Sequence, residues 1–181
     1  SQRTRDRFGN HNWGTRALLA RRLVEGGANW VTVVMENPYG DTGVPWIDEG
    51  AYNWDSHAVN AHIFKDSEWR LPVYDQALTA LIEDLYERGL DRKVLLVATG
   101  EFGRTPRITV QRGTKTGVEQ PGRDHWPKAM SVLVSGGGMR TGQVIGATNS
   151  KGEHPVERIL TPNDLWASVY RHLGINHKHT L

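Results

Sequence analysis

The sequence lacks cysteine altogether, which excludes disulfides, thiolate metal sites and a cysteine nucleophile. It also lacks any apolar run of about 18 residues, so it predicts no transmembrane helix. It has no large excess of charge of either sign, because 22 Lys and Arg against 20 Asp and Glu leave a net charge of +2. Hydrophobic residues make up 38% of the 181 residues, and there are no repeats or low-complexity tracts, so we expect a globular protein.

The sequence does contain alternating helical and strand patterns. Apolar residues at helical spacing predict three helices, over residues 13–25, 72–88 and 162–172. Near-continuous apolar runs predict three buried strands, over residues 30–35, 93–98 and 130–134. The segments between them are expected to be loops or irregular structure, chiefly residues 36–70, 99–128 and 142–160. The glycines of residues 136–138 lack the spacing of a phosphate-binding loop and predict a tight chain reversal.

This order of elements predicts an α/β domain with a mostly parallel sheet flanked by helices. No linker divides the chain, so residues 1–181 are expected to belong to one domain. Ligands of such sheets bind outside the carboxyl ends of the strands. The expected loops over residues 36–70 and 99–128 lie there and carry the most chemically distinctive residues of the chain.

Two acidic residues with nearby histidines stand in these loops. Asp55 and His57 form a short Asp-x-His motif, which in most proteins is a hydrogen-bonded loop pair and in some a set of metal ligands. Asp124 and His125 are adjacent in the second loop, where they either orient that loop or bind a ligand.

A third acidic residue, Glu101, follows the expected strand over residues 93–98. Removing a carboxylate from water there is costly unless something binds it. The partner is either a metal ion or one of the nearby arginines, Arg104 and Arg107. Taken together, these carboxylates and imidazoles suit zinc, manganese or a similar divalent ion. Arg104 and Arg123 lie in the same loop and could hold an oxyanion in bidentate fashion.

At these motifs the sequence resembles the exported bacterial family called domain of unknown function 1501 (DUF1501), of the alkaline phosphatase and sulfatase superfamily. The resemblance follows the order and spacing of motifs along nearly the whole chain. It is carried by residues 18–27, 54–57, 100–106, 122–127, 136–140, 142–148 and 162–173.

The resemblance implies a doubly wound α/β fold with divalent metal ligands on the strand-end loops. Asp55 and His57 match the first ligand pair of the superfamily, Glu101 matches its second carboxylate, and His125 matches its late histidine. Asp124 is implied as an extra ligand or as a residue that orients a ligand. Zinc is the first expectation for the ion, with manganese or calcium as alternatives.

The sequence departs from the superfamily pattern in two ways. Phe102 follows Glu101 where a histidine is usual, and phenylalanine cannot bind metal. The nucleophile and the first ligand come from the amino-terminal half of the superfamily domain, so the resemblance implies that residues 1–181 are the carboxy-terminal portion of one domain. The missing half is then an expected partner. Family members also carry an export signal, which implies a periplasmic or cell-envelope location.

The leading hypothesis is a metal-dependent, hydrolase-like domain for phosphate or sulfate esters, in which a small anionic ester is the substrate. The alternative is a non-catalytic binding or structural module of an exported protein that keeps the fold. The seven tryptophans either pack in the core or form an interaction surface. Nucleic-acid binding through the arginine-rich start has little support from the small net charge. An incomplete sheet would expose an edge, which favours association into oligomers.

Overall fold

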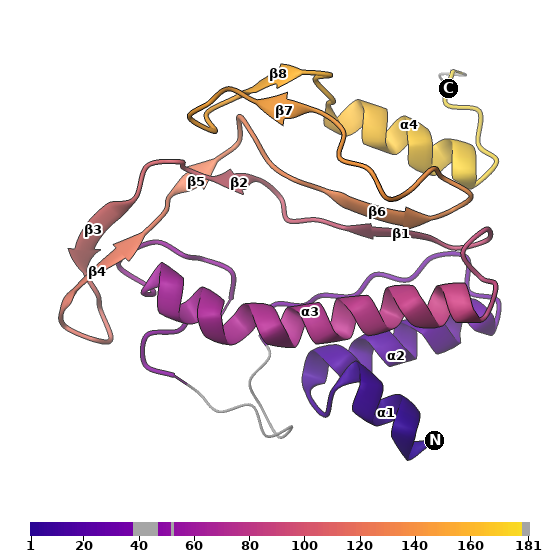
Figure 1. Ribbon diagram of the computed structural model, residues 1–181, viewed down its shortest axis with the longest axis horizontal. Coiled ribbons are helices and arrows are strands. Elements are labelled where there is room, and N and C mark those ends of the chain that lie inside the picture. The colour runs from indigo at the N-terminus through magenta and orange to yellow at the C-terminus, as the bar shows by residue number, and fades with distance from the viewer. Residues whose placement is uncertain (38–46, 52, 179–181) are drawn as a thin grey trace. The chain divides into compact units, whose positions relative to one another are not determined.

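A computed structural model describes residues 1–37, 47–51 and 53–178 (Figure 1). The chain divides into two compact units. The first comprises Ser1–Arg88 and Arg107–Asp124, and the second comprises Gly89–Pro106 and His125–Leu181. Among the described residues, no helix is both long enough and apolar enough to cross a membrane. The expectation that all residues belong to one domain stays a prediction.

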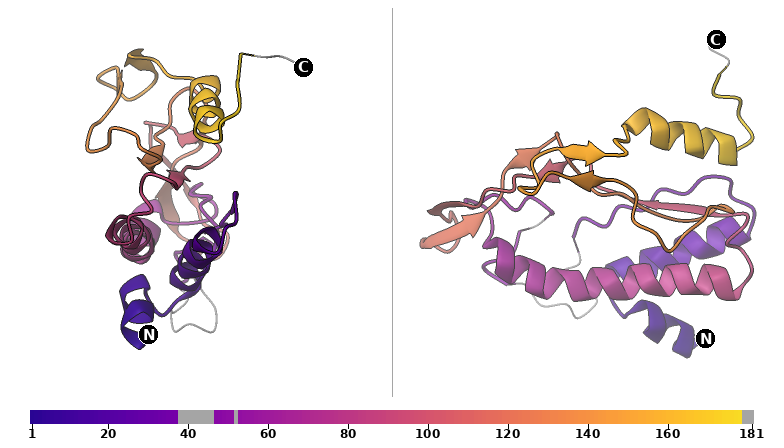
Figure 2. Two further views of the ribbon diagram at one scale, coloured as in Figure 1. Left: turned by 90° about the vertical axis from the view of Figure 1, so that its right-hand side faces the viewer. Right: turned by 45° about the horizontal axis from the view of Figure 1, so that its top comes forward.

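The first unit is built on three helices, α1 (Gln2–Phe8), α2 (Asn12–Glu25) and α3 (Ile63–Glu87). Helix α2 lies alongside α3 (Figure 2), and α1 packs against both. Their buried apolar residues form the core of this unit: Phe8, Trp13, Ala17, Leu18, Ala77, Ala80, Leu81 and Leu85. The helix expected over residues 13–25 is therefore confirmed, because its apolar stripe does face a core.

Helix α3 begins at Ile63, well before the expected start at Pro72, which lies inside the helix. The expectation of a loop through residue 70 is wrong. Two buried residues of the early turns, Asp66 and Arg70, form an ion pair at 2.8 Å, and Asp66 accepts the Ala51 N–H at 3.0 Å. These tertiary contacts stabilise the turns before the proline, whose missing N–H usually marks a helix start. Of the expected loop, residues 38–46 and 52 lie outside the described residues.

Residues 30–35, expected to form a buried strand, have no strand partner in the described structure. Their exposure instead alternates along the chain, with Trp30 57% and Val34 58% exposed. Helix side chains bond the backbone here, since Arg16 donates to the Val34 carbonyl at 2.7 Å and Arg70 donates to the Glu36 carbonyl at 3.2 Å. The buried-strand prediction is wrong, because apolar and β-branched composition alone cannot supply a neighbouring strand.

A β-hairpin completes the first unit. Strand β3 (Thr109–Arg112) pairs antiparallel with β4 (Glu119–Gly122), and β4 contacts α3. The sequence predicts a loop here, because glycine, proline and polar residues dominate the segment. The hairpin forms nevertheless because its ladder and its contacts with the loop around Ala58 satisfy the backbone.

The second unit contains three short strand pairs and one helix. Strand β1 (Leu95–Ala98) pairs with β6 (Leu133–Gly136), and β2 (Gly103–Arg104) pairs with β5 (His125–Trp126). The third pair is β7 (Ala147–Thr148) with β8 (Pro155–Glu157), and the helix is α4 (Pro162–His172). The α4 start follows the expectation, because the Asp164 carboxylate accepts the Thr161 N–H and hydroxyl, both at 2.7 Å.

The mixture of helices and strands agrees with the α/β class in its coarse sense. Every sheet within the described residues, however, consists of two antiparallel strands. The doubly wound, mostly parallel sheet is therefore not seen in this part of the chain. The expected chain reversal at Gly136, Gly137 and Gly138 is confirmed, since all three have positive φ and the Met139 N–H closes a turn on the Gly136 carbonyl at 3.1 Å.

Candidate metal centre

Asp55 and His57 face each other in a short loop of the first unit. One carboxylate oxygen of Asp55 bonds His57 Nδ1, and the other accepts the Asn60 side-chain amide at 2.7 Å. The Asn53 side chain accepts the Asp55 N–H at 2.9 Å, which fixes the backbone before the pair. Because a carboxylate only accepts, His57 Nδ1 carries a hydrogen, and in the neutral ring Nε2 is then the nitrogen with the lone pair.

Asp124 lies on the other side of the same imidazole. Its Oδ1 atom is 3.8 Å from His57 Nε2, which is too long for a hydrogen bond. Two ligand atoms each about 2.1 Å from one ion would be this far apart at a bond angle of about 130°. The side chains of His57 and Asp124 are 27% and 43% exposed, so an ion can reach the gap from solvent. The spacing fits a divalent ion.

Backbone contacts hold this loop against the β3–β4 hairpin. The Arg123 N–H donates to the Ser56 carbonyl at 2.9 Å, which ties the chain beside Asp124 to the chain beside His57. Gly122 makes this approach possible, because a Cβ there would stand 2.0 Å from the Ala58 nitrogen. Arg123, one of the two expected anion-binding arginines, is thus placed beside the Asp55–His57 loop through its backbone.

Two residues support this loop: Gln120, which sequence reasoning missed, and Trp54, which it placed only within the motif over residues 54–57. Gln120 is 2% exposed, and its side-chain amide donates to the Ala58 carbonyl at 2.7 Å. Trp54, directly before Asp55, stacks on Trp13 with ring centroids 5.5 Å apart and planes 11° apart. The sequence holds no signal for the role of Gln120, because its partner is a backbone group 62 positions away in the chain.

This stack shows, for part of the tryptophans, whether they pack in the core or form a surface. Trp13 is fully buried, and the edge of Tyr74 meets both tryptophans, at 6.1 Å from Trp13 and 5.5 Å from Trp54. The guanidinium of the buried Arg70 lies 5.1 Å from the Trp54 ring centroid. Trp13 therefore packs in the core of the first unit, and Trp54, which is 38% exposed, anchors the loop against it.

The second unit brings together another part of the predicted set. Arg104 in β2 stands directly opposite His125 in β5, and opposed residues of an antiparallel pair share a face. The Phe102 ring lies 4.2 Å from the His125 ring, centroid to centroid. Glu101 is exposed, between β1 and β2.

The predicted residues thus fall into two groups. The first unit holds Asp55, His57, Asp124 and Arg123, whereas the second holds Glu101, Arg104 and His125. Asp55, His57 and His125 offer the carboxylate and imidazole ligand atoms that divalent ions take. Convergence of all five expected ligands on one ion stays a prediction.

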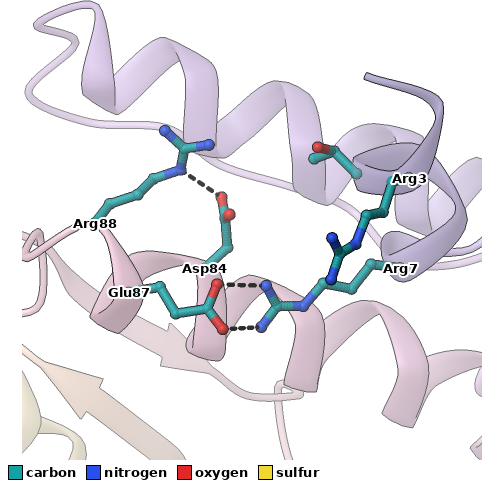
Figure 3. Close-up of a pocket in the computed structure, with 6 residues that line it drawn as sticks. Arg3, Arg7, Asp84, Glu87 and Arg88 are labelled. Carbon is teal, nitrogen blue, oxygen red and sulfur yellow. Dashed lines mark hydrogen bonds and ion pairs between the residues drawn. The ribbon is translucent and has the colours of Figure 1, made fainter.

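A cavity of about 650 Å³ elsewhere in the first unit has a different character (Figure 3). Arg3, Arg7 and Arg88 line it together with Asp84 and Glu87. Arg7 donates to both oxygens of Glu87 at 2.6 and 2.8 Å, and Arg88 donates to Asp84 at 3.0 Å. Because these charges compensate one another, we interpret the charged residues around the cavity as a structural cluster of ion pairs that joins α1 and α3.

The family model described as "Protein of unknown function (DUF1501)" matches residues 1–181. No curated protein and no solved structure matches the chain.

Proposed function

Because the chain belongs to the DUF1501 family throughout residues 1–181, we propose a function that its shared motifs and the geometry around His57 support together. It is a metal-dependent, hydrolase-type domain that acts on small phosphate or sulfate esters. The observation that carries the proposal is the arrangement of His57 between Asp55, which holds Nδ1, and Asp124, which stands 3.8 Å from Nε2. A carboxylate that orients a histidine for a metal ion is a common feature of such centres.

The proposed ligands are His57 through Nε2 and Asp124 through a carboxylate oxygen. His125 is proposed as a further ligand on the family resemblance. His125 follows Asp124 directly, so the peptide bond keeps its Cα within about 3.8 Å of the Asp124 Cα. Asp55 orients His57 in this scheme. Glu101 is proposed as a further ligand on the family resemblance. Two nitrogens and carboxylate oxygens suit zinc first, then manganese.

Two arginines are proposed to bind the anionic group of the ester. Arg123 is placed beside the His57 loop by its backbone bond to Ser56, and Arg104 stands opposite His125. Guanidinium groups hold phosphate and sulfate oxygens in bidentate fashion and stabilise charge that develops on them. A divalent ion, when bound, would polarise the ester oxygen and lower the pKa of the attacking group.

The family resemblance supports three finer proposals. They are membership of the alkaline phosphatase and sulfatase superfamily, its doubly wound parallel sheet as the complete fold, and an exported, periplasmic location. The amino-terminal half of such a domain would supply the nucleophile. Export is testable by locating the tagged full-length protein in fractionated cells.

Elemental analysis of the purified protein tests the metal proposal. We expect near-stoichiometric zinc or manganese in the unaltered chain and strongly reduced metal in His57→Ala and Asp124→Asn. His177→Ala is the matched control, because His177 is an exposed histidine outside the proposed ligands, and its metal content should not change. A protein that stays metal-free after incubation with zinc, manganese and calcium would refute the proposal.

A second candidate function, a binding module without catalysis, is favoured by one observation. Phe102 packs on His125 at 4.2 Å, so an apolar ring stands where the superfamily usually has a histidine ligand. The metal-loaded full-length protein decides between the two. Turnover of phosphate or sulfate esters that is lost in Arg123→Ala supports the hydrolase, whereas metal binding without turnover supports the binding module.

A further inference from the structure

The loop that carries Asp55 and His57 is anchored at both ends by parts of the chain far away in sequence. At its start, Trp54 is inserted against Trp13 and Tyr74. At its end, the β3–β4 hairpin bonds successive carbonyls of the loop. The Thr114 N–H and hydroxyl both donate to the Val59 carbonyl at 2.9 Å, and Gln120 donates to the Ala58 carbonyl.

Gln120 is the best-defined of these anchors. Its side chain is buried, and both ends of its amide are used. The nitrogen donates to the Ala58 carbonyl at 2.7 Å, while the oxygen accepts the Thr116 hydroxyl at 2.8 Å. The Ala58 carbonyl can only accept, so it fixes which way the amide points, and the Thr116 hydroxyl holds the other end of the amide.

This amide acts on the residue next to His57. Ala58 is held from two sides, by the Gln120 amide at its carbonyl and by the close approach of the Gly122 backbone at its nitrogen. Since the His57 side chain cannot move far while the next peptide is fixed, the position of Nε2 relative to Asp124 depends on the hairpin. Asp124 itself follows β4 by two residues, so one hairpin locates both sides of the 3.8 Å gap.

We propose that Gln120 is a positioning residue: through the Ala58 carbonyl it sets the distance between His57 Nε2 and Asp124 Oδ1, and so the affinity of the site for a divalent ion. The expected effect on metal affinity rests on the proposed metal function, whereas the positioning of His57 by Gln120 does not depend on a bound metal. Residues that orient metal ligands typically change metal affinity by about 10–100-fold when they are lost, and ligand geometry must be held to about 0.5 Å.

The test uses four variants of the full chain. Gln120→Glu keeps the shape and the acceptor for Thr116 but removes the donor to Ala58. Gln111→Glu is the matched control, because Gln111 stands directly opposite Gln120 in the same hairpin and is exposed. Thr116→Val leaves Gln120 in place but releases its amide, and Thr116→Ser restores the hydroxyl.

Three quantities are measured for each variant: zinc affinity by competition with a chelator, the thermal midpoint, and the ¹⁵N signals of the His57 ring in metal-free protein. We expect about 10-fold weaker zinc binding in Gln120→Glu, a smaller loss in Thr116→Val, and recovery in Thr116→Ser. The His57 signals should shift in Gln120→Glu and Thr116→Val and stay unchanged in Gln111→Glu.

Unchanged zinc affinity and unchanged His57 signals in folded Gln120→Glu would overturn the proposal, even if the thermal midpoint falls. Should that variant fail to fold, the same two measurements on Thr116→Val and Thr116→Ser test the proposal. If the unaltered protein binds no zinc, the metal function fails, yet shifted His57 signals would still support the positioning of His57 by Gln120. Failure of the two proposals is therefore distinguishable.

Discussion

His57 and Asp124 face each other across 3.8 Å, with the imidazole Nε2 directed at a carboxylate oxygen. Asp55 bonds the opposite ring nitrogen, so the imidazole lies between two carboxylates. The two residues are 67 positions apart in sequence (124 minus 57) and are brought together by the contact between the loop and the β3–β4 hairpin. This relationship is the basis of the first prediction.

Asp55→Ala should weaken zinc binding by about 10–100-fold, because His57 loses the acceptor that fixes its tautomer and ring orientation. Asp55→Asn, which retains a side-chain carbonyl acceptor, should lose less. Chelator competition measures both. Asp48→Asn serves as the control, since Asp48 is an exposed carboxylate outside the proposed ligands. Equal affinity in Asp55→Ala and the unaltered protein would exclude an orienting role.

Gly122→Ala should destabilise the first unit by about 1–3 kcal/mol, because the new Cβ would stand 2.0 Å from backbone of the Asp55–His57 loop. The hairpin must then move away and widen the gap at His57. Gly100→Ala is a suitable control, since its Cβ would meet only the Phe102 carbonyl, at 3.8 Å. Chemical denaturation measures both changes, and equal stability of the two variants would contradict the steric argument.

Asp84→Ala should destabilise the protein by about 1–3 kcal/mol, because it removes the buried carboxylate that pairs with the buried Arg21 guanidinium. Arg21 Nε lies 2.6 Å from Asp84 Oδ2, and the two side chains are only 5% and 7% exposed. The same arginine also pairs with Glu25, which is 42% exposed, so Glu25→Ala should change the midpoint of urea unfolding very little. Similar losses in both variants would argue against burial as the cause.

Stability should fall on acidification because of His11, the residue that precedes α2. The His11 Nδ1 accepts the Gly14 N–H at 3.1 Å, and burial lowers the pKa of His11 below its usual 6.5. The folded state therefore prefers the neutral ring, whose contribution is complete above about pH 6.5 and is lost as the pH falls toward the lowered folded-state pKa.

The His11→Asn variant isolates this effect, since asparagine caps a helix without titrating near neutrality. Its thermal midpoint should depend less on pH between about 5 and 7 than that of the unaltered protein. An identical pH profile in the two proteins would show that other groups are responsible.

Much of the local structure could be predicted because its causes are local. The helix expected over residues 162–172 has the same bounds as α4, since its Thr-Pro start and apolar spacing are contained within the segment. The strand expected over residues 93–98 appears as β1, beginning at Leu95. The bond between Asp55 and His57 is local as well, because residues two apart in a loop readily meet.

Short-range features thus follow from the residues alone: helix periodicity and caps, the glycine reversal at the end of β6, and the chemical character of the Asp55 and His57 pair. Three features follow instead from long-range contacts: the extension of α3 back to Ile63, the hairpin of residues 109–122, and the position of Gln120 and Asp124 beside the His57 loop. The physical reason is that each of these depends on a partner far away in sequence. A buried ion pair, a backbone carbonyl or a glycine-sized gap stabilises such arrangements, and none of them leaves a periodic pattern in the chain.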